Sequence, residues 1–132
     1  GNYDGDFYFV YLLTKKIIWK YTGAGPFLAS PAISGEKVII GSQDQYIYCF
    51  NKTNGKVLWK FKTLGKVEGS AVIAGDKVVI GSGDGRLYLL DLETGAKTWS
   101  YEIGSAIVSS PAVIKDRVII AAMDGKVYAF GK

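Results

Sequence analysis

The stretch DLETGAKTW at residues 91–99 decides the fold, because a related stretch, NKTNGKVLW, occupies residues 51–59. Each stretch ends in a tryptophan, and Trp19, Trp59 and Trp99 stand 40 residues apart. Other residues keep this interval: Asp4, Asp44, Asp84 and Asp124; Tyr8, Tyr48, Tyr88 and Tyr128; Ser30, Ser70 and Ser110. A fixed period of this length is the signature of a repeat architecture.

The repeats fill the chain without gaps. Units at 1–40, 41–80 and 81–120 align directly, and residues 121–132 begin a further copy. No linker or low-complexity tract divides the 132 residues, so we expect a single partial propeller domain over 1–132. Recurring residues are expected to belong to the scaffold, and function is expected where the copies differ.

Each repeat predicts four short β-strands separated by turns. For one copy we expect strands at 70–74, 77–82, 86–91 and 96–102. Turn pairs such as the Asp-Gly at 84–85 tolerate the positive φ of a tight hairpin. Short strands at regular spacing are typical of an all-β sandwich, barrel or propeller.

The distribution of apolar residues narrows this choice to a propeller. The second strand of each copy is a continuous apolar run, at 38–40, 78–80 and 118–120, which indicates burial on both faces. The fourth strand alternates, with Val57, Trp59 and Phe61 on one side and lysines on the other. We therefore expect an all-β propeller of four-stranded antiparallel blades, with lysines protecting their outer edges.

The chain holds about three and a third such blades. We expect two strands in the first blade, at 6–12 and 16–22, four in each of the next two, and three in the last. The apolar run at 7–13 is expected to be a buried strand.

Residues 91–99 resemble the repeat of the pyrroloquinoline-quinone-type (PQQ-like) propeller family, whose pattern is roughly Ala-x-Asp-x-x-Thr-Gly-x-x-x-Trp. Four residues match this pattern: Asp91, Thr94, Gly95 and Trp99. The preceding copy keeps Gly55 and Trp59, whereas the first copy keeps Trp19 and has Lys15 at the glycine position. Ser-Pro-Ala at 30–32 and 110–112 and Gly-Ser-x-Asp at 41–44 and 81–84 are also similar to the family.

The resemblance implies that the tryptophan strand is outermost and that its indole docks on the neighbouring blade. Burial of an indole in this way stabilises the contact by about 2–3 kcal/mol. The alternative role for Trp19, Trp59 and Trp99 is an aromatic platform that stacks sugars or bases. The family includes quinoprotein dehydrogenases with PQQ and calcium, and non-enzymatic propellers of the outer-membrane assembly lipoprotein type.

The residues offer little catalytic chemistry. The chain has no histidine, which excludes Ser-His, Cys-His and His-metal sites, and it has no phosphate-binding loop. Its one cysteine, Cys49, aligns with Leu89 and Ala129 and is expected in the core. Asp44, Asp84 and Asp124 are expected to stabilise turns. We therefore predict no catalytic residue, no metal site, no bound cofactor and no enzyme activity.

The charge pattern is that of a solvated surface. The formal net charge is +4, and the lysines are scattered over predicted outer strands and turns. Nucleic-acid binding requires clustered basic residues with exposed aromatic side chains, whereas the aromatics of this chain are at positions expected in the core. Nucleic acid is therefore not an expected partner. No apolar run approaches the roughly 20 residues that span a membrane as a helix.

Binding residues are expected on loops that a rigid scaffold supports. The loops at 23–29, 64–69 and 104–109 differ between copies and are expected to share one face with the turns at 42–45, 82–85 and 122–125. We predict that four residues of this face contact a partner: Phe27, Lys66, Glu68 and Ile107. The alternative is that Phe27, Val67 and Ile107 only plug the central channel.

Closed propellers typically have about four to eight blades, so this arc is short of a ring. We expect a C-terminal fragment of a longer chain, and the alternative is a small protein that closes its ring by self-association. Residues 127–132 resemble the natural end of such a propeller. The missing edge would then pair with remaining blades or with another copy.

Three functions are compatible with this sequence. The first is a non-catalytic propeller that scaffolds a protein complex or senses a ligand. The second is a fragment of a PQQ-dependent quinoprotein dehydrogenase, and the third is the accessory domain of another enzyme or kinase. By analogy with the family, we expect an extracytoplasmic location, in the periplasm or at the cell surface.

Overall fold

The computed structural model describes residues 1–131 and consists of β-strands joined by turns. The strands are β1 (Asp6–Tyr11), β2 (Lys16–Thr22), β3 (Ala32–Ser34), β4 (Lys37–Gly41), β5 (Tyr46–Asn51), β6 (Val57–Lys62), β7 (Val72–Ala74), β8 (Lys77–Gly81), β9 (Arg86–Asp91), β10 (Lys97–Glu102), β11 (Ala112–Ile114), β12 (Arg117–Ala121) and β13 (Val127–Phe130). Lys132, the last residue of the predicted partial repeat, lies outside the described residues.

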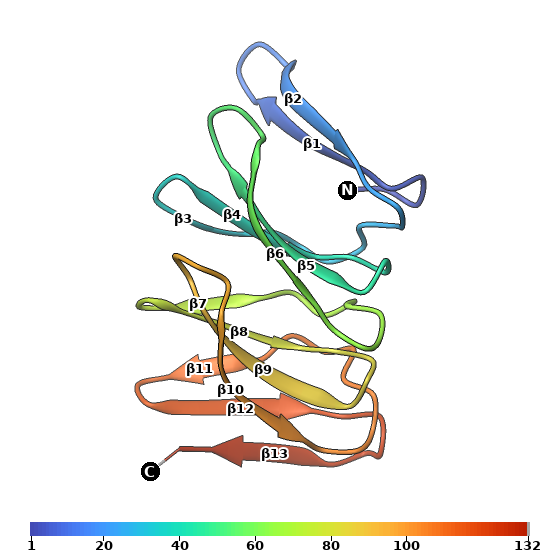
Figure 1. Cartoon of the computed structure of the whole chain (residues 1–132), viewed down its shortest axis with the longest axis vertical. Helices are drawn as coiled ribbons and strands as arrows, with labels where there is room; N and C mark the ends of the chain where they lie inside the picture. The colour runs from blue at the N-terminus through green and yellow to red at the C-terminus, as the bar shows by residue number, and fades with distance from the viewer. Residues whose placement is uncertain (132) are drawn as a thin grey trace.

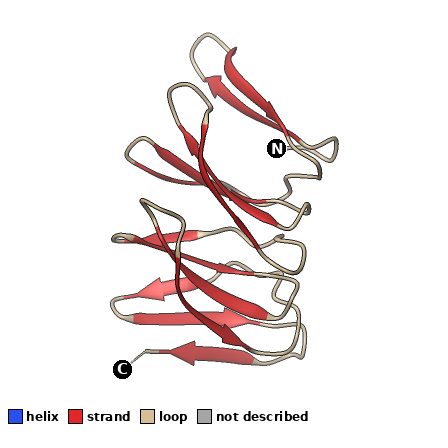
Figure 2. Cartoon of the chain, in the orientation of Figure 1, coloured by secondary structure: helices blue, strands red, loops and turns tan. Residues whose placement is uncertain are grey.

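The strands form four antiparallel sheets, which follow one another along an arc (Figures 1 and 2). We call them blades one to four; they are β1–β2, β3–β6, β7–β10 and β11–β13. In each blade, consecutive strands are hydrogen-bonded neighbours. The expected fold, an all-β partial propeller with two, four, four and three strands per blade, is confirmed.

The core lies between neighbouring blades. Ile39 and Ile47 of blade two pack in one cluster with Val78 and Ile80 of blade three, and all four side chains are fully buried. The apolar runs at 38–40 and 78–80 are therefore buried on both faces, as predicted. In the last blade the prediction is wrong for Ile119, which is 40% exposed on the outer face of the arc. This face-to-face packing is what a propeller requires.

The first strand of each blade is shorter than predicted. In blade three it begins at Val72, and Ser70 lies before the strand in a contact between blades. The Ser70 backbone N–H donates to the Ser110 hydroxyl at 2.9 Å, and the Ser30 N–H donates to the Ser70 hydroxyl at the same distance. The recurring serines thus link one repeat to the next.

The predicted alternation of the fourth strand is wrong at its beginning. The register of β6 shifts so that Trp59 pairs with Cys49 and Val57 pairs with Phe50, which leaves Leu58 as the extra residue of a bulge. Val57 and Leu58 are consequently half-exposed. The same irregularity precedes Trp19 and Trp99.

The prediction of a buried strand over 7–13 is also wrong at its C-terminal end. Strand β1 ends at Tyr11, and Leu12 and Leu13 lie in the following turn with 86% and 83% of their surfaces exposed. The turn closes through Lys15, whose φ is 57° and whose backbone N–H donates to the Tyr11 carbonyl.

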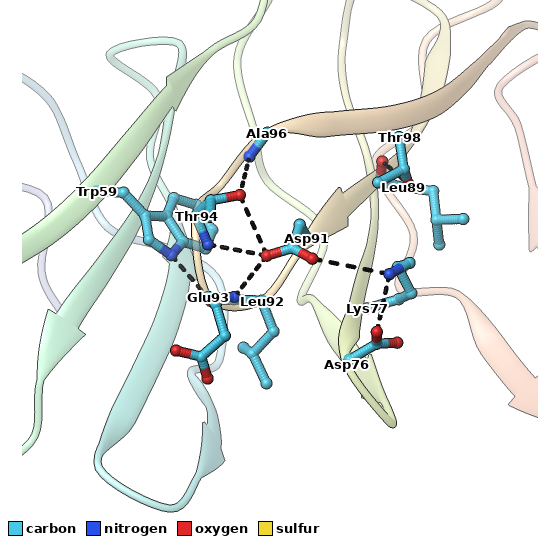
Figure 3. Close-up of polar contacts among 10 residues, drawn as sticks. All are labelled: Trp59, Asp76, Lys77, Leu89, Asp91, Leu92, Glu93, Thr94, Ala96 and Thr98. Atoms are coloured by element: carbon cyan, nitrogen blue, oxygen red, sulfur yellow. Dashed lines mark hydrogen bonds and ion pairs between the residues drawn. The ribbon is translucent and has the colours of Figure 1, made fainter.

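The tryptophans join the blades, as the family resemblance implies. The Trp59 indole N–H donates to the Leu92 carbonyl of the next blade at 2.9 Å (Figure 3). Trp19 makes the same bond with the Lys52 carbonyl at 2.7 Å. Both indoles are at least nine-tenths buried. Trp99 is 41% exposed and packs against Tyr101 and Phe130.

The turn that receives each indole is held by one side chain. In blade three, a carboxylate oxygen of Asp91 accepts the backbone N–H groups of Glu93 and Thr94 and the Thr94 hydroxyl (Figure 3). In blade two, the Asn51 amide oxygen accepts two backbone N–H groups at the same place. The Asp and Gly of the repeat motif are therefore structural, since they shape the turn on which an indole rests.

Gly95 is expected to tolerate no side chain. Its φ is 73°, and a Cβ would lie 2.5 Å from the Trp59 ring. Gly95→Ala should lower the free energy of unfolding by about 2–4 kcal/mol through backbone strain and overpacking. Gly75→Ala is the control, because Gly75 has a φ of 61° and nothing within 4 Å; it should cost about 1 kcal/mol. Urea unfolding measures both, and equal losses would contradict the docking role.

Asp91 should make stability depend on acid pH. Hydrogen bonds from Thr94 hold the pKa of its carboxyl below the ordinary value of 3.8. Its contribution is therefore fully present above pH 3.8 and is lost as the pH falls through the lower pKa of the folded state. Asp91→Asn keeps the turn, as Asn51 does, and should flatten the decline of the urea midpoint below that pH. An unchanged acid decline would refute this assignment.

Candidate interaction face

The loops that follow the tryptophan strands are clamped between neighbouring blades. In the loop at 64–69, the Val67 N–H donates to the Ser42 carbonyl of blade two, and the Gly83 N–H of blade three donates to the Lys66 carbonyl. The loops at 23–29 and 104–109 make the corresponding bonds. The predicted gathering of these loops with the 42–45, 82–85 and 122–125 turns is confirmed. We call this surface the loop face.

Buried hydroxyls reinforce the clamp. Ser42 is fully buried, and its hydroxyl donates to the Pro26 carbonyl at 3.1 Å. Ser82 is also fully buried and reaches the Gly65 carbonyl at 3.4 Å. Because both the backbone and these side chains hold the loops, the exposed side chains of the loop face stand on a rigid support.

The prediction that Phe27 and Ile107 contact a partner is corrected by their burial. Phe27 is 1% exposed and Ile107 is 0% exposed, as is Val67 at the same position of the intervening copy. A Cβ added to Gly41 would lie within 3 Å of the Val67 side chain, and Gly81 has the same relation to Ile107. These loop residues fill the space above a glycine of the second strand, which agrees with the alternative of a packing role.

Lys66 and Glu68, the other two predicted binding residues, lie on the loop face. Lys66 is exposed, whereas Glu68 is partly buried. The Gln43 side-chain amide donates to the Glu68 carboxylate at 2.5 Å, which ties the loop to the adjacent turn of blade two. A contact of either residue with a partner stays a prediction, and Lys66 is the more accessible of the two.

Four apolar residues of the loop face were missed by sequence reasoning. Leu64, Met123, Val108 and Leu28 are 72%, 68%, 42% and 38% exposed. The Leu64 N–H donates to the Asp84 carboxylate at 3.0 Å, which places this leucine beside the turn of blade three. The available signal was the difference between copies, because Ala24, Leu64 and Gly104 share one repeat position.

The recurring aspartates stabilise turns at the loop face, as predicted. Asp84 accepts the Arg86 N–H at 2.9 Å and the Tyr88 hydroxyl at 2.6 Å. Asp44 accepts the Tyr46 N–H and the Tyr48 hydroxyl in the same way, and Asp124 accepts the Lys126 N–H and the Tyr128 hydroxyl. Burial and the neighbouring carboxylate raise the pKa of Tyr88, so its hydroxyl stays a donor. In blade one, Tyr8 donates to Asp6 rather than to Asp4.

Other reactive groups on the described part of the chain are few. Cys49 is fully buried, and burial raises its pKa to about 11, so the thiol stays protonated at neutral pH. Residues 1–131 contain no group of three or more His, Cys, Asp or Glu side chains that could hold a metal ion. Over the same residues, no helix is long and apolar enough to cross a membrane.

Solved structures with a similar arrangement carry three different kinds of name. BamB from Moraxella catarrhalis is 26% identical, with a TM-score of 0.87 over 97% of this chain and 40% of its own. The computationally designed Ika4 protein is 18% identical, with a TM-score of 0.88 over 98% of this chain and 81% of its own. The quinohemoprotein alcohol dehydrogenase ADHIIG from Pseudomonas putida HK5 is 21% identical, with a TM-score of 0.72 over 78% and 18% of the two chains.

The last two likenesses show the fold alone, and this chain spans less than half of the BamB structure. No curated protein matches the sequence. A family model described as outer membrane protein assembly factor BamB matches residues 4–132. The match includes all three tryptophans and the turns that receive two of them, and the chain belongs to this family of PQQ-like propellers.

Proposed function

We propose that this chain is a non-catalytic propeller that acts through protein contacts in the assembly of outer membrane proteins. The observation that carries the proposal is the family match over residues 4–132, whose description names an outer membrane protein assembly factor. That description also favours an extracytoplasmic location, in the periplasm or at the cell surface. The partner is a protein, and the site is the loop face.

The construction of the loop face supports this role. Its exposed residues Leu64 and Lys66 belong to a loop that is hydrogen-bonded to blades on both sides. A rigid loop loses little conformational entropy when it binds, so few contacts suffice for useful affinity. The exposed Leu64 also offers an apolar centre for a protein contact, and the charge of Lys66 can steer an acidic partner toward it.

The alternative, a fragment of a PQQ-dependent dehydrogenase, needs residues that hold PQQ and calcium. Calcium requires six to eight oxygen ligands. The aspartates of the loop face, Asp44, Asp84 and Asp124, are each occupied by a tyrosine hydroxyl and a backbone N–H. These three aspartates therefore do not fit a calcium site as they stand, and we derive no step through a calcium-bound quinone.

The first test changes the loop face in the cell. In the source organism, Leu64→Asp with Lys66→Glu should lower the amount of folded outer membrane protein nearly as much as deletion of the gene. The physical reason is that one new negative charge replaces an apolar side chain and the other replaces a positive charge, so a partner that fits the parent surface is repelled. Lys56→Glu, at an exposed position at the other end of the strands, is the matched control and should retain function. Normal outer membrane protein in the double variant would refute the proposed site.

The second test separates the two functions in solution. We expect the melting temperature of the full chain to stay unchanged when PQQ and calcium are added together. A cofactor at about 100 times its dissociation constant would stabilise the folded state by about 2.7 kcal/mol, which is several degrees. A rise of that size, lost when either component is omitted, would favour the dehydrogenase.

A further inference from the structure

The hairpin between β1 and β2 differs from the corresponding hairpins of the other repeats, and the docking of an indole on the next blade does not explain the difference. The corresponding turns, at 51–56 and 91–96, are capped by Asn51 and Asp91, and their one large apolar residue, Leu92, is buried. Residues 11–16 read Tyr-Leu-Leu-Thr-Lys-Lys, and an aromatic residue takes the place of the capping side chain. We call residues 11–16 with Ile17 and Ile18 the apolar tip.

The apolar tip does not receive an indole in the manner of the other turns. Lys15 occupies the position of Gly55 and Gly95 with a similar positive φ of 57°. At those glycines a Cβ would lie 2.6 and 2.5 Å from the docked indole. The Cβ of Lys15 stands in that place, so a tryptophan of another blade cannot dock here with the same geometry.

Three residues of the tip are exposed for a reason that does not depend on what lies beside blade one. These residues, Leu13, Ile17 and Ile18, are 83%, 58% and 45% exposed. Their counterparts in blades two and three are exposed as well. The counterparts are Thr53 and Glu93 for Leu13, Val57 and Lys97 for Ile17, and Leu58 and Thr98 for Ile18. Blade one is therefore the blade in which all three of these outer positions are apolar.

The charges of the tip itself have one sign. No Asp or Glu occurs in the sequence between Asp6 and Glu36, and this segment contains three lysines. Lys20 pairs with Asp6 at 3.0 Å. Lys15 and Lys16 are exposed and follow Leu13 after Thr14. The tip thus combines the exposed Leu13, Ile17 and Ile18 with two lysines, and it lies at one extreme of the arc (Figure 1).

We propose that the apolar tip inserts into the interface of a bilayer that contains anionic lipid. The side chains of Leu13, Ile17 and Ile18 enter the boundary between headgroups and acyl chains, and each lysine extends along its apolar stem so that its ammonium group meets lipid phosphate. Lysine is depleted in protein–protein interfaces, which favours a lipid surface over a protein groove as the occupant.

This membrane contact leaves the loop face free. Strand β1 runs from Asp6, beside the loop face, to Tyr11 at the tip, so the two surfaces lie at opposite ends of the strands. A protein partner and a bilayer can therefore be bound at the same time. The inference rests on the tip alone and does not depend on the proposed function.

The test is co-sedimentation of the full chain with vesicles of phosphatidylcholine and phosphatidylglycerol, beside vesicles of phosphatidylcholine alone. We expect binding to the anionic vesicles, weaker at high salt. Leu13→Ser with Ile17→Ser should weaken it by about tenfold or more. Lys16→Ser should weaken binding by about fivefold and remove part of the preference for anionic lipid.

The matched control removes the same kind of side chains from the next blade. Val57→Ser with Leu58→Ser changes two exposed apolar residues at the outer edge of blade two and should leave vesicle binding unchanged. Urea midpoints check that every variant is folded. Absence of anionic-vesicle binding, or equal binding by the parent and the double serine variant, would overturn the proposal. If a cross-linker placed at the tip captures a protein in the parent but not in the double serine variant, and no vesicle binding is seen, the proposal is overturned and the tip contacts a protein instead.

Discussion

The docking of one indole on the next blade is the contact on which the rest of the arc depends. Trp59 crosses to the turn of blade three, where its N–H finds the Leu92 carbonyl and its ring covers Gly95. This contact sets the separation of the blades at their outer edge, so the second and third strands meet face to face and bury their apolar runs. Stability in such a chain is a sum of contacts between neighbours.

The same spacing builds the loop face at the other end of the strands. Neighbouring blades stand close enough for one loop to bond to both, as Val67 does with Ser42 and Lys66 does with Gly83. Inward side chains of these loops must fill the space over a glycine, and all three copies carry an apolar residue there. Outward positions carry no such constraint, which is why the copies differ there.

The period of the sequence predicted the blades and their strand counts, because both recur with the repeat, whereas the docking role of the tryptophans was implied by the family resemblance. The bulge before Trp59 could not be predicted, since it depends on how the strand pairs with Cys49 and Phe50. The burial of Phe27 and Ile107 depends on close approach to glycines far away in the sequence. Glu68 was correctly placed on the loop face, but its bond to Gln43 is visible only in three dimensions.

Departures from a repeat have two different physical meanings, and the first blade contains both. A change where a neighbour packs limits what can be assembled there, and Lys15 in place of glycine is of this kind because its Cβ would meet an indole. A change at a position that is exposed in every blade costs the fold nothing, and Leu13 is of this kind. Selection for stability has no reason to place a leucine there, because exposed leucine gains no burial and invites association. A contact outside the propeller is therefore the physical reason to keep it.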